Sequence, residues 1–309
     1  MTTLEPEIGS AELARAARIL AIRVRREATG LFAGGYASAF RGGGMEFHES
    51  RPYVPGDDVR AFDWNALART GEPFVKRYRE ERDLTVWIAL DVSASMRFGA
   101  LGRVKAGVAA HAAALLAAAA GQTGDRVGLV AFADVVRAEV PAARGPSHIW
   151  HVVQTAGLCA GSAAGGTRLG VGIEALVARA RQRSISVLLS DFRDPALLDP
   201  SGVAGLLALS RRHDVVCAVL YDPREESLPS VGLVRVEDPE RPGRTQVLHT
   251  GRKRARARYR RAWAARCAAL ERALRSAGCD VVWMRTDRDP LRTWMHFFEQ
   301  RAARSRVAS

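Results

Sequence analysis

The chain is poor in cysteine and in long apolar runs, and each shortage excludes a class of protein. Its four cysteines lie far apart without a CxxC pair, which excludes a disulfide scaffold and a zinc ribbon and favours a reducing compartment. No run reaches the roughly 18 apolar residues of a membrane helix, and the polar start MTTLEPEIGS is unlike a signal peptide. We therefore expect a soluble, cytoplasmic protein without membrane insertion.

Several motifs of catalysis are also missing. The segment GSAAGGT is close to a phosphate-binding loop, but Gly166 stands where a lysine should precede the threonine. Neither a G-x-S-x-G nucleophile elbow nor an H-E-x-x-H helix occurs. A phosphatase-type nucleophile at Asp91 would need an acid two residues on, where Ser93 stands. We expect a protein that is not an enzyme, and we keep magnesium-dependent hydrolysis as an alternative.

The net charge of +13 is concentrated at the end of the chain. Residues 223–309 hold 20 basic and 10 acidic residues, and residues 252–261 read RKRARARYRR. Such a run is found in nucleic-acid patches. It also fits the solvent-facing side of an amphipathic helix over 252–277, which is the interpretation that we favour; nucleic-acid binding stays an alternative. The apolar side of that helix would carry Tyr259, Trp263, Cys267, Leu270 and Leu274.

From residue 83 on, apolar strands alternate with helices. Strands are predicted over 84–90, 126–132, 185–189, 215–220 and 280–284, with a further run at 135–140 that could pair beside the second. The alternation predicts an α/β fold, a doubly wound, mostly parallel sheet covered by helices on both faces. We expect an α/β domain over residues 83–309, with a short β insertion near 222–249.

Residues 1–82 read as a small N-terminal segment that packs against this sheet. A helix is predicted over 10–28, a short helix over 61–70 and a strand over 74–79. The glycines of GLFAGGYASAFRGGG predict turns or close backbone contacts, and Pro55-Gly56 predicts a type II turn. We expect Trp64 in the core, and we expect nearby Arg and Asp residues to hold the segment on the sheet by ion pairs.

Oxygen-bearing side chains follow the predicted strands, at the edge of the sheet where ligands bind. The first strand leads into DVSASM, the segment GGT precedes a helix, and the strand over 185–189 leads into Ser190-Asp191. Such hard oxygen ligands suit Mg²⁺, with Mn²⁺ or Ca²⁺ as alternatives. Hydroxyls would bind the ion directly, and one coordination position would remain for a partner's carboxylate. The predicted ligands are Asp91, Ser93, Ser95, Thr167 and Asp191.

Two families are similar to these segments. DVSASM, GGT and LLSD, in this order, resemble the metal-ion-dependent adhesion site (MIDAS) of von Willebrand factor A-like domains, and all five ligand positions match. The block GGGMEFHESRPYVPGDDVRAFDWNALARTGEPFVKRYREERD resembles the signature of the bacterial DUF58 family, which precedes a von Willebrand A-like domain. With DRVGLVAF, LLSDF and the end near 291–301, the resemblance covers roughly residues 30–301.

The resemblance implies a role. DUF58 members are typically encoded beside MoxR-type AAA+ ATPases and are thought to act with them as adaptors in chaperone-like maturation or activation of other proteins. We accordingly expect a non-catalytic adaptor that binds a MoxR-type ATPase and a client protein through the metal site. The residues expected to flank the partner's carboxylate are Met96, Arg97, Arg168 and Arg193.

Overall fold

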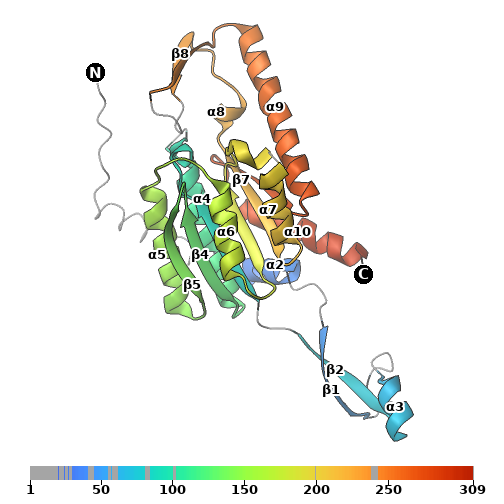
Figure 1. Ribbon diagram of the computed structural model, residues 1–309. Helices are drawn as coiled ribbons and strands as arrows, with labels where there is room; N and C mark the ends of the chain where they lie inside the picture. Colours follow the sequence, from blue (N-terminus) through green and yellow to red (C-terminus); the bar gives the residue numbers. More distant parts are fainter. Residues whose placement is uncertain are drawn as a thin grey trace.

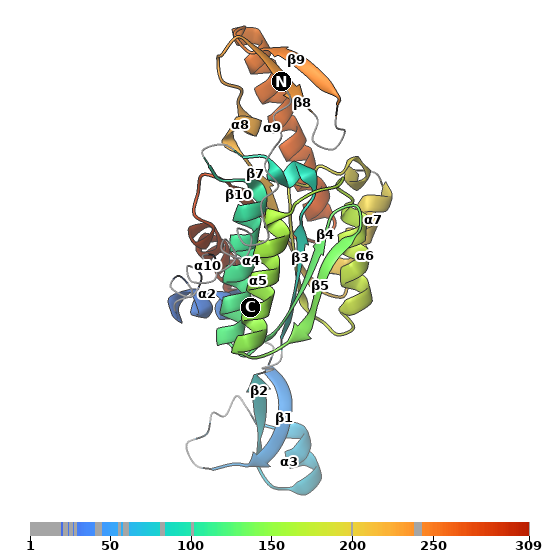
Figure 2. The same ribbon diagram turned by 90° about the vertical axis from the view of Figure 1, so that its left-hand side faces the viewer.

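A computed structural model describes residues 20, 24, 27, 30–40, 45–54, 57, 62–80, 84–99, 102–198, 200–237 and 243–308. Figure 1 shows a layered body, an arm that projects from its lower end, and a hairpin with a long helix at its upper end. The views in Figures 1 and 2 agree on this arrangement. The body contains the residues that the sequence predicts as a metal site.

The body is built on a sheet whose strands are β3 (Thr85–Asp91), β4 (Arg126–Phe132), β5 (Val136–Ala143), β6 (Ile185–Ser190), β7 (Asp214–Tyr221) and β10 (Asp280–Arg285). Their order is β10-β7-β6-β3-β4-β5. Every neighbouring pair is parallel except β4 with β5. The sheet confirms the predicted α/β fold class.

Helices cover both faces because the strands are apolar on both. Within β3, Val86 and Ile88 face one layer, and Trp87 and Ala89 face the other. The first layer holds α2 (Gly30–Phe40), α4 (Lys105–Gln122), α5 (Pro146–Gly161) and α10 (Pro290–Ala308). The second holds α6 (Leu169–Arg179), α7 (Pro200–Ser210) and α9 (Lys253–Ser276). In the described part of the chain, each helix is too short or too polar to cross a membrane.

The strand order creates a topological switch point at one edge of the sheet. The chain leaves β3 through the short helix η2 (Ala94–Arg97) toward α4, in the first layer. It leaves the neighbouring strand β6 through η3 (Pro195–Leu198) toward α7, in the second layer. Connections that depart to opposite faces open a space between the carboxyl ends of two adjacent strands, where ligands bind in such folds. Asp91 and Asp191 lie at these two ends.

The arm differs from the sequence prediction. It consists of the antiparallel strands β1 (Met45–Pro52) and β2 (Phe74–Glu80) with the helix α3 (Trp64–Thr70), and it projects away from the sheet. Trp64 is 66% exposed and stacks on Phe62 at a ring distance of 5.4 Å, so its predicted place in the core is wrong. The ion pair between Arg51 and Asp57, at 2.6 Å, joins two residues of this N-terminal region and not the region to the sheet.

The glycine-rich stretch forms a helix instead of the predicted turns. Phe32 and Tyr36, four residues apart on α2, both contact Phe298 of α10, at ring distances of 5.5 and 6.1 Å. Tertiary packing of this aromatic face outweighs the low helix propensity of glycine. The helix predicted over 10–28 is described only at residues 20, 24 and 27, which are helical, and the turn at 55–56 lies outside the described residues.

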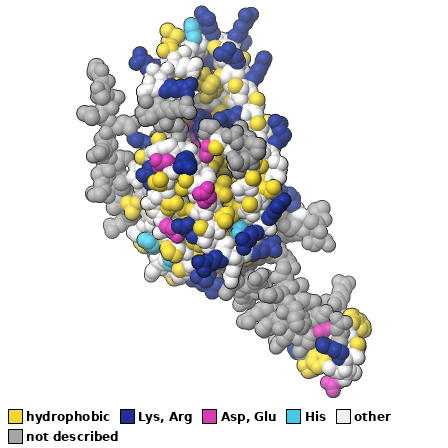
Figure 3. All heavy atoms as spheres, viewed as in Figure 1, with side chains coloured by type: hydrophobic (Ala, Val, Ile, Leu, Met, Phe, Trp, Pro, Cys, Tyr) yellow, Lys and Arg dark blue, Asp and Glu magenta, His cyan; other side chains and the backbone are white. Residues whose placement is uncertain are grey.

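The insertion contains a short helix α8 (Pro223–Glu226) and an antiparallel hairpin of β8 (Leu233–Glu237) and β9 (Thr245–His249), as the predicted β element required. On α9, Leu270 and Leu274 are buried and Tyr259 and Trp263 are half-buried, which confirms the predicted apolar side. Most of the arginines of α9 are exposed. Figure 3 shows Lys and Arg side chains gathered at this upper end.

Close packing of α6 on the sheet generates the first prediction. A Cβ atom at Gly172 would lie 2.7 Å from the Phe132 ring, whereas a Cβ atom at Gly170 meets nothing within 4 Å. Gly172→Ala should therefore lower the free energy of unfolding by about 1–3 kcal/mol through overpacking. Gly170→Ala, on the same helix, should leave it unchanged or raise it by up to about 1 kcal/mol, because alanine favours the helix more than glycine does. Urea unfolding of the two variants measures the difference, and equal stabilities would contradict the packing.

Candidate metal centre

Asp91 ends β3 at this edge of the sheet and is completely buried. One carboxylate oxygen, Oδ1, accepts a hydrogen bond from the backbone N–H of Ser93 at 2.9 Å. The other, Oδ2, accepts one from the hydroxyl of Ser190, at the end of the neighbouring strand β6. Pairing of Leu90 with Leu189 brings these strand ends side by side. The sheet register therefore fixes the position of the Asp91 carboxylate.

Three hydroxyls meet beside Asp91. The Oγ atoms of Ser93 and Ser95 are 3.2 Å apart, and Thr167 Oγ1 lies 3.3 Å from Ser95 Oγ and 2.8 Å from Ser93 Oγ. Ser93 and Ser95 follow β3, whereas Thr167 comes from the loop before α6. The structure thus brings together the three hydroxyl residues that the sequence predicts as ligands, although more than 70 positions separate Thr167 from the others.

The loop that carries Thr167 is held by backbone hydrogen bonds. Ala94 N–H donates to the carbonyl of Gly165, and Ala164 N–H donates to the carbonyl of Val92, each at 2.8 Å. Gly165 has φ +85°, a left-handed conformation, and a Cβ atom there would lie 2.8 Å from the carboxylate of Asp134. Glycine satisfies both demands, so GGT is a local requirement for placing the threonine hydroxyl.

Asp191 is bound by a buried lysine that sequence reasoning missed. Lys105 Nζ, at the start of α4, lies 2.5 Å from Asp191 Oδ2 and 2.9 Å from Glu225 Oε1. Its side chain is completely buried. Arg193 also contacts Glu225, with Nη2 at 2.9 Å from Oε1. Removing one partner of a buried ion pair destabilises the folded state, because the other partner is left as a buried charge without compensation.

The loop after β6 is bent sharply around this ion-pair group. Phe192 has φ 52°, a left-handed conformation that is strained for a residue with a Cβ atom. Its N–H donates to the Ser190 hydroxyl at 2.9 Å, and Arg193 N–H donates to Asp191 Oδ1 at 3.2 Å. The bend lets Ser190 face Asp91 while Asp191 faces Lys105. The two carboxylates therefore lie close enough to interact, each with its own partners.

Burial makes the Asp91 carboxylate costly to ionise. Burial and, next, the negative charge of Asp191 raise the pKa of Asp91 from 3.8 to about 7, against the opposing effect of its hydrogen bonds from Ser190 and Ser93. Of the basic residues at this edge, Lys105 and Arg193 pair with Asp191 and Glu225. Arg266 also lies near these two acids. Asp91 is the carboxylate without a basic side chain at ion-pair distance within the described residues.

The donor set fits a small hard cation. In an octahedral magnesium site with bonds of about 2.1 Å, neighbouring ligand atoms lie about 3 Å apart. The hydroxyl oxygens of Ser93, Ser95 and Thr167 are separated by 2.8–3.3 Å, which matches one face of such an octahedron. Asp91 and Asp191 add negative charge behind that face. The exposed fractions of the three hydroxyl residues are 0%, 1% and 8%, so the site is closed to solvent in this structure.

The residues predicted to flank a partner's carboxylate differ in how far they are exposed. Met96 is completely buried and packs in the core, so its predicted place at the partner surface is wrong. Arg193 is half-buried in its contact with Glu225. Arg97 and Arg168 are exposed. Lys105 could have been suspected from the sequence, since it is a lone charge at the start of an alanine-rich helix. Glu225 offered no comparable signal.

Comparison with known proteins identifies relatives along most of the chain. Residues 49–269 match the family described as "Protein of unknown function DUF58". Uncharacterized proteins of Mycobacterium bovis and of Mycobacterium tuberculosis (strain H37Rv) are each 33% identical over 299 residues, which cover 96% of this chain and 92% of the relative. These relatives therefore match the arm, the sheet and the C-terminal helices together.

Solved structures give more distant similarities. A von Willebrand factor type A protein from Catenulispora acidiphila is 15% identical, with TM-score 0.40, over 74% of this chain and 44% of its own. An aerotolerance-related membrane protein from Bacteroides fragilis is 18% identical, with TM-score 0.45, over 72% of this chain and 99% of that one. A membrane-spanning protein from Vibrio fischeri is 14% identical, with TM-score 0.25, over 71% and 98%.

The cytoplasmic location predicted from the sequence is corrected by these similarities. Two of the solved structures described above are named as a membrane protein and a membrane-spanning protein. The prediction took the lack of a long apolar run as evidence of location. That feature describes the helices of this chain alone, and it does not decide whether the protein works at a membrane with other components.

The raised pKa of Asp91 generates a prediction about stability. Since the folded state holds the Asp91 proton up to about pH 7 and the unfolded state releases it near 3.8, ionisation opposes folding progressively between these values. Asp91→Asn removes this cost. The variant should therefore gain stability relative to the wild type as the pH rises from 4 to 7, with both proteins in a chelator. Urea unfolding across that range measures the gain, and parallel pH profiles would contradict it.

Proposed function

Because the chain belongs to the DUF58 family, whose function is unknown, we propose a function from its own site: a metal-dependent protein-interaction domain without catalytic activity. The coarser part of this proposal, an interaction domain, is suggested by the family together with the von Willebrand A-like fold. The observation that carries the finer part is the triangle of hydroxyls beside two acidic residues. Its oxygen-only composition and spacing favour Mg²⁺.

In this proposal Ser93, Ser95 and Thr167 hold the cation through their hydroxyls, while Asp91 balances part of its charge. Asp191, the other acid of the predicted set, is paired with Lys105 in this structure. A bound Mg²⁺ supplies a concentrated positive charge at the edge of the sheet. Lys105, Arg193 and Arg266 give this edge as many basic residues as acidic ones, so a divalent cation makes the site net positive. A carboxylate from a partner protein is the group that completes this balance.

A closed site fits regulated binding. The exposed neighbours Arg97 and Arg168 lie beside the buried hydroxyls in the sequence, where they can guide an acidic side chain toward the edge of the sheet. Entry of a carboxylate requires the residues that cover Ser93 and Ser95 to move. Based on the family resemblance alone, we propose a MoxR-type AAA+ ATPase as the partner, since such an ATPase can couple nucleotide hydrolysis to movements of this kind in an adaptor and its client.

The alternative, magnesium-dependent hydrolysis, is less favoured by the hydrogen bonds of the acidic residues. A general base needs a carboxylate oxygen that can face a water molecule. Both oxygens of Asp91 accept hydrogen bonds, from Ser93 and Ser190. The oxygens of Asp191 face Lys105 and the N–H of Arg193. Neither acid is placed to activate water, so we propose binding in preference to catalysis.

Removal of single hydroxyls tests the cation site. Thr167→Val and Ser95→Ala each delete one proposed ligand with little change of shape, and each should weaken Mg²⁺ binding at least about tenfold, because the other donors cannot complete the same face of the octahedron. Calorimetric titration of Mg²⁺ into chelator-treated protein measures the affinity. Ser162→Ala, which removes an exposed hydroxyl near the end of α5, is the control and should bind like the wild type.

Two results would contradict the cation site. Wild-type protein that takes up no Mg²⁺ at millimolar concentration would remove its basis. Equal affinities of the wild type and Thr167→Val would place any bound ion elsewhere. Circular dichroism of each variant separates lost binding from lost folding.

A binding assay tests the partner. A purified MoxR-type ATPase from the same bacterium should be retained by the immobilised wild-type protein in Mg²⁺, and it should be lost in a chelator and with Thr167→Val. Replacing Arg254, Arg258 and Arg261 by glutamine, on the exposed side of α9, should leave retention unchanged. Retention that survives chelation would contradict metal-dependent binding. Loss with the α9 variant would make the basic helix the interface.

The same α9 variant addresses nucleic-acid binding. If the exposed arginines bind a phosphate backbone, fluorescence anisotropy with a labelled duplex should report an affinity that falls steeply with salt and is abolished by the variant. We expect only weak binding of this kind, equal in the two proteins at physiological salt.

A further inference from the structure

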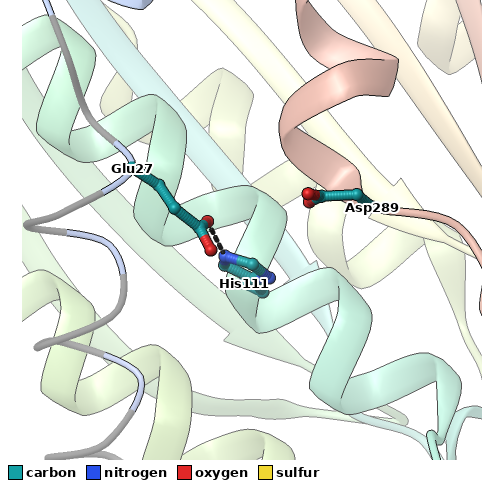
Figure 4. Close-up of side chains that lie close together, drawn as sticks. All are labelled: Glu27, His111 and Asp289. Atoms are coloured by element: carbon teal, nitrogen blue, oxygen red, sulfur yellow. Dashed lines mark hydrogen bonds and ion pairs between the residues drawn. The ribbon is translucent and has the colours of Figure 1, made fainter.

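A second group of potential metal ligands lies away from the hydroxyl triangle. Figure 4 shows Glu27, His111 and Asp289 with their side chains turned toward one another. They come from three distant parts of the chain: a helical residue near the N-terminus, the middle of α4, and the residue before α10. The fold therefore brings together one imidazole and two carboxylates that no sequence motif connects.

The geometry of this group suits a single ion. His111 Nε2 lies 2.7 Å from Glu27 Oε2, and one ligand atom from each of the three residues lies within 4.8 Å of the others. His111 is only 4% exposed, so its ring is fixed by the packing of α4. Glu27 and Asp289 are half-buried, which leaves a side from which an ion can enter. Small movements of two flexible carboxylates would bring all three atoms to bonding distance.

The hydrogen bond between His111 and Glu27 does not account for the third residue. Two carboxylates at this separation repel each other, and in a half-buried place that repulsion is poorly screened. Asp289 Oδ1 accepts a hydrogen bond from the N–H of Leu291 at 3.1 Å, in the manner of a helix cap. The guanidinium of Arg103 donates to the carbonyl of the preceding residue, Arg288, at 3.2 Å. A divalent cation bound to both carboxylates would remove their mutual repulsion.

We propose that Glu27, His111 and Asp289 form a site for a divalent transition-metal ion, with Zn²⁺ the best match to one imidazole and two carboxylates. Such a set supplies three of the four ligands of a tetrahedral ion and leaves the last position to water. The bound ion joins the N-terminal helical residues, α4 and the start of α10. It differs in chemistry from the oxygen-only site at Asp91, and the proposal does not depend on that site.

Cobalt titration of the full-length protein tests this proposal. Co²⁺ replaces Zn²⁺ in nitrogen and oxygen sites, and its visible absorption is intense in four-coordinate sites and weak in octahedral ones. We expect one equivalent of Co²⁺ to give the intense bands, and Zn²⁺ to displace it. Thr167→Val should give the same bands, because it alters only the other site.

Two variants assign the ligands. Asp289→Asn keeps an oxygen that can cap α10 but removes the charge, and His111→Gln removes the imidazole. Each should weaken Co²⁺ binding at least about tenfold. Asp287→Asn, at an exposed acid two residues away that pairs with Arg285, is the matched control and should bind like the wild type. Circular dichroism checks folding, which Asp289→Asn should preserve even if His111→Gln does not.

The outcomes separate the proposal from its rivals. Absence of the intense bands at one equivalent and at excess Co²⁺ would overturn it and leave Glu27 and His111 as a hydrogen-bonded pair. Bands that persist unchanged in a folded Asp289→Asn variant would also overturn it. Anomalous diffraction at the zinc edge, from crystals grown with Zn²⁺, should place the ion between these three residues.

Discussion

Burying the carboxylates of Asp191 and Glu225 at the edge of the sheet requires positive charge beside them, and Lys105 supplies it from the start of α4. A buried carboxylate without such a partner would be protonated or would prevent folding. The ammonium group joins the loop after β6 to α8 and to the first layer of helices. Because these segments are fixed to one another, Asp91, Ser190 and the hydroxyls can be held in a single arrangement.

The same contact gives the two aspartates different partners. Asp191 forms an ion pair with Lys105, whereas Asp91 accepts hydrogen bonds from Ser93 and Ser190. Burial and the negative charge of Asp191 raise the pKa of Asp91 to about 7, since these hydrogen bonds do not fully offset the cost of a buried negative charge. A cation bound to the hydroxyls would stabilise the ionised Asp91 carboxylate and would leave the ion pair between Lys105 and Asp191 in place. The fold thus places a buried ion pair, Lys105 with Asp191, beside a second carboxylate, Asp91, whose charge a reversibly bound cation can balance.

Much of this could be predicted from the sequence, for reasons that differ between elements. Strands buried on both faces are continuous apolar runs, so β3, β6 and β7 are visible in the pattern. Asp91 and Asp191 follow from where such strands end, and Thr167 from the GGT segment that precedes a helix. The helix α2 could not be predicted, because glycine disfavours helices and only contacts with Phe298 of α10 overcome that preference. The place of Trp64 was predicted wrongly for the converse reason. A large aromatic side chain usually lies in the core, but the arm that carries Trp64 on α3 projects away from the sheet.

Helix α4 shows why the roles of Lys105 and His111 were not predicted from the sequence. Alanines make up most of its length, and they allow the sheet and three other helices to approach it so closely that nearly every side is buried. Small neighbours leave room for a few large polar side chains, and Lys105 and His111 occupy it. Six residues apart, they are separated by about 9 Å along the helix axis. One rigid element therefore positions the lysine of the first site and the histidine of the second. Because it is packed on all sides, α4 cannot shift toward one site without moving at the other, so a change of ligand at either edge is resisted by the same core.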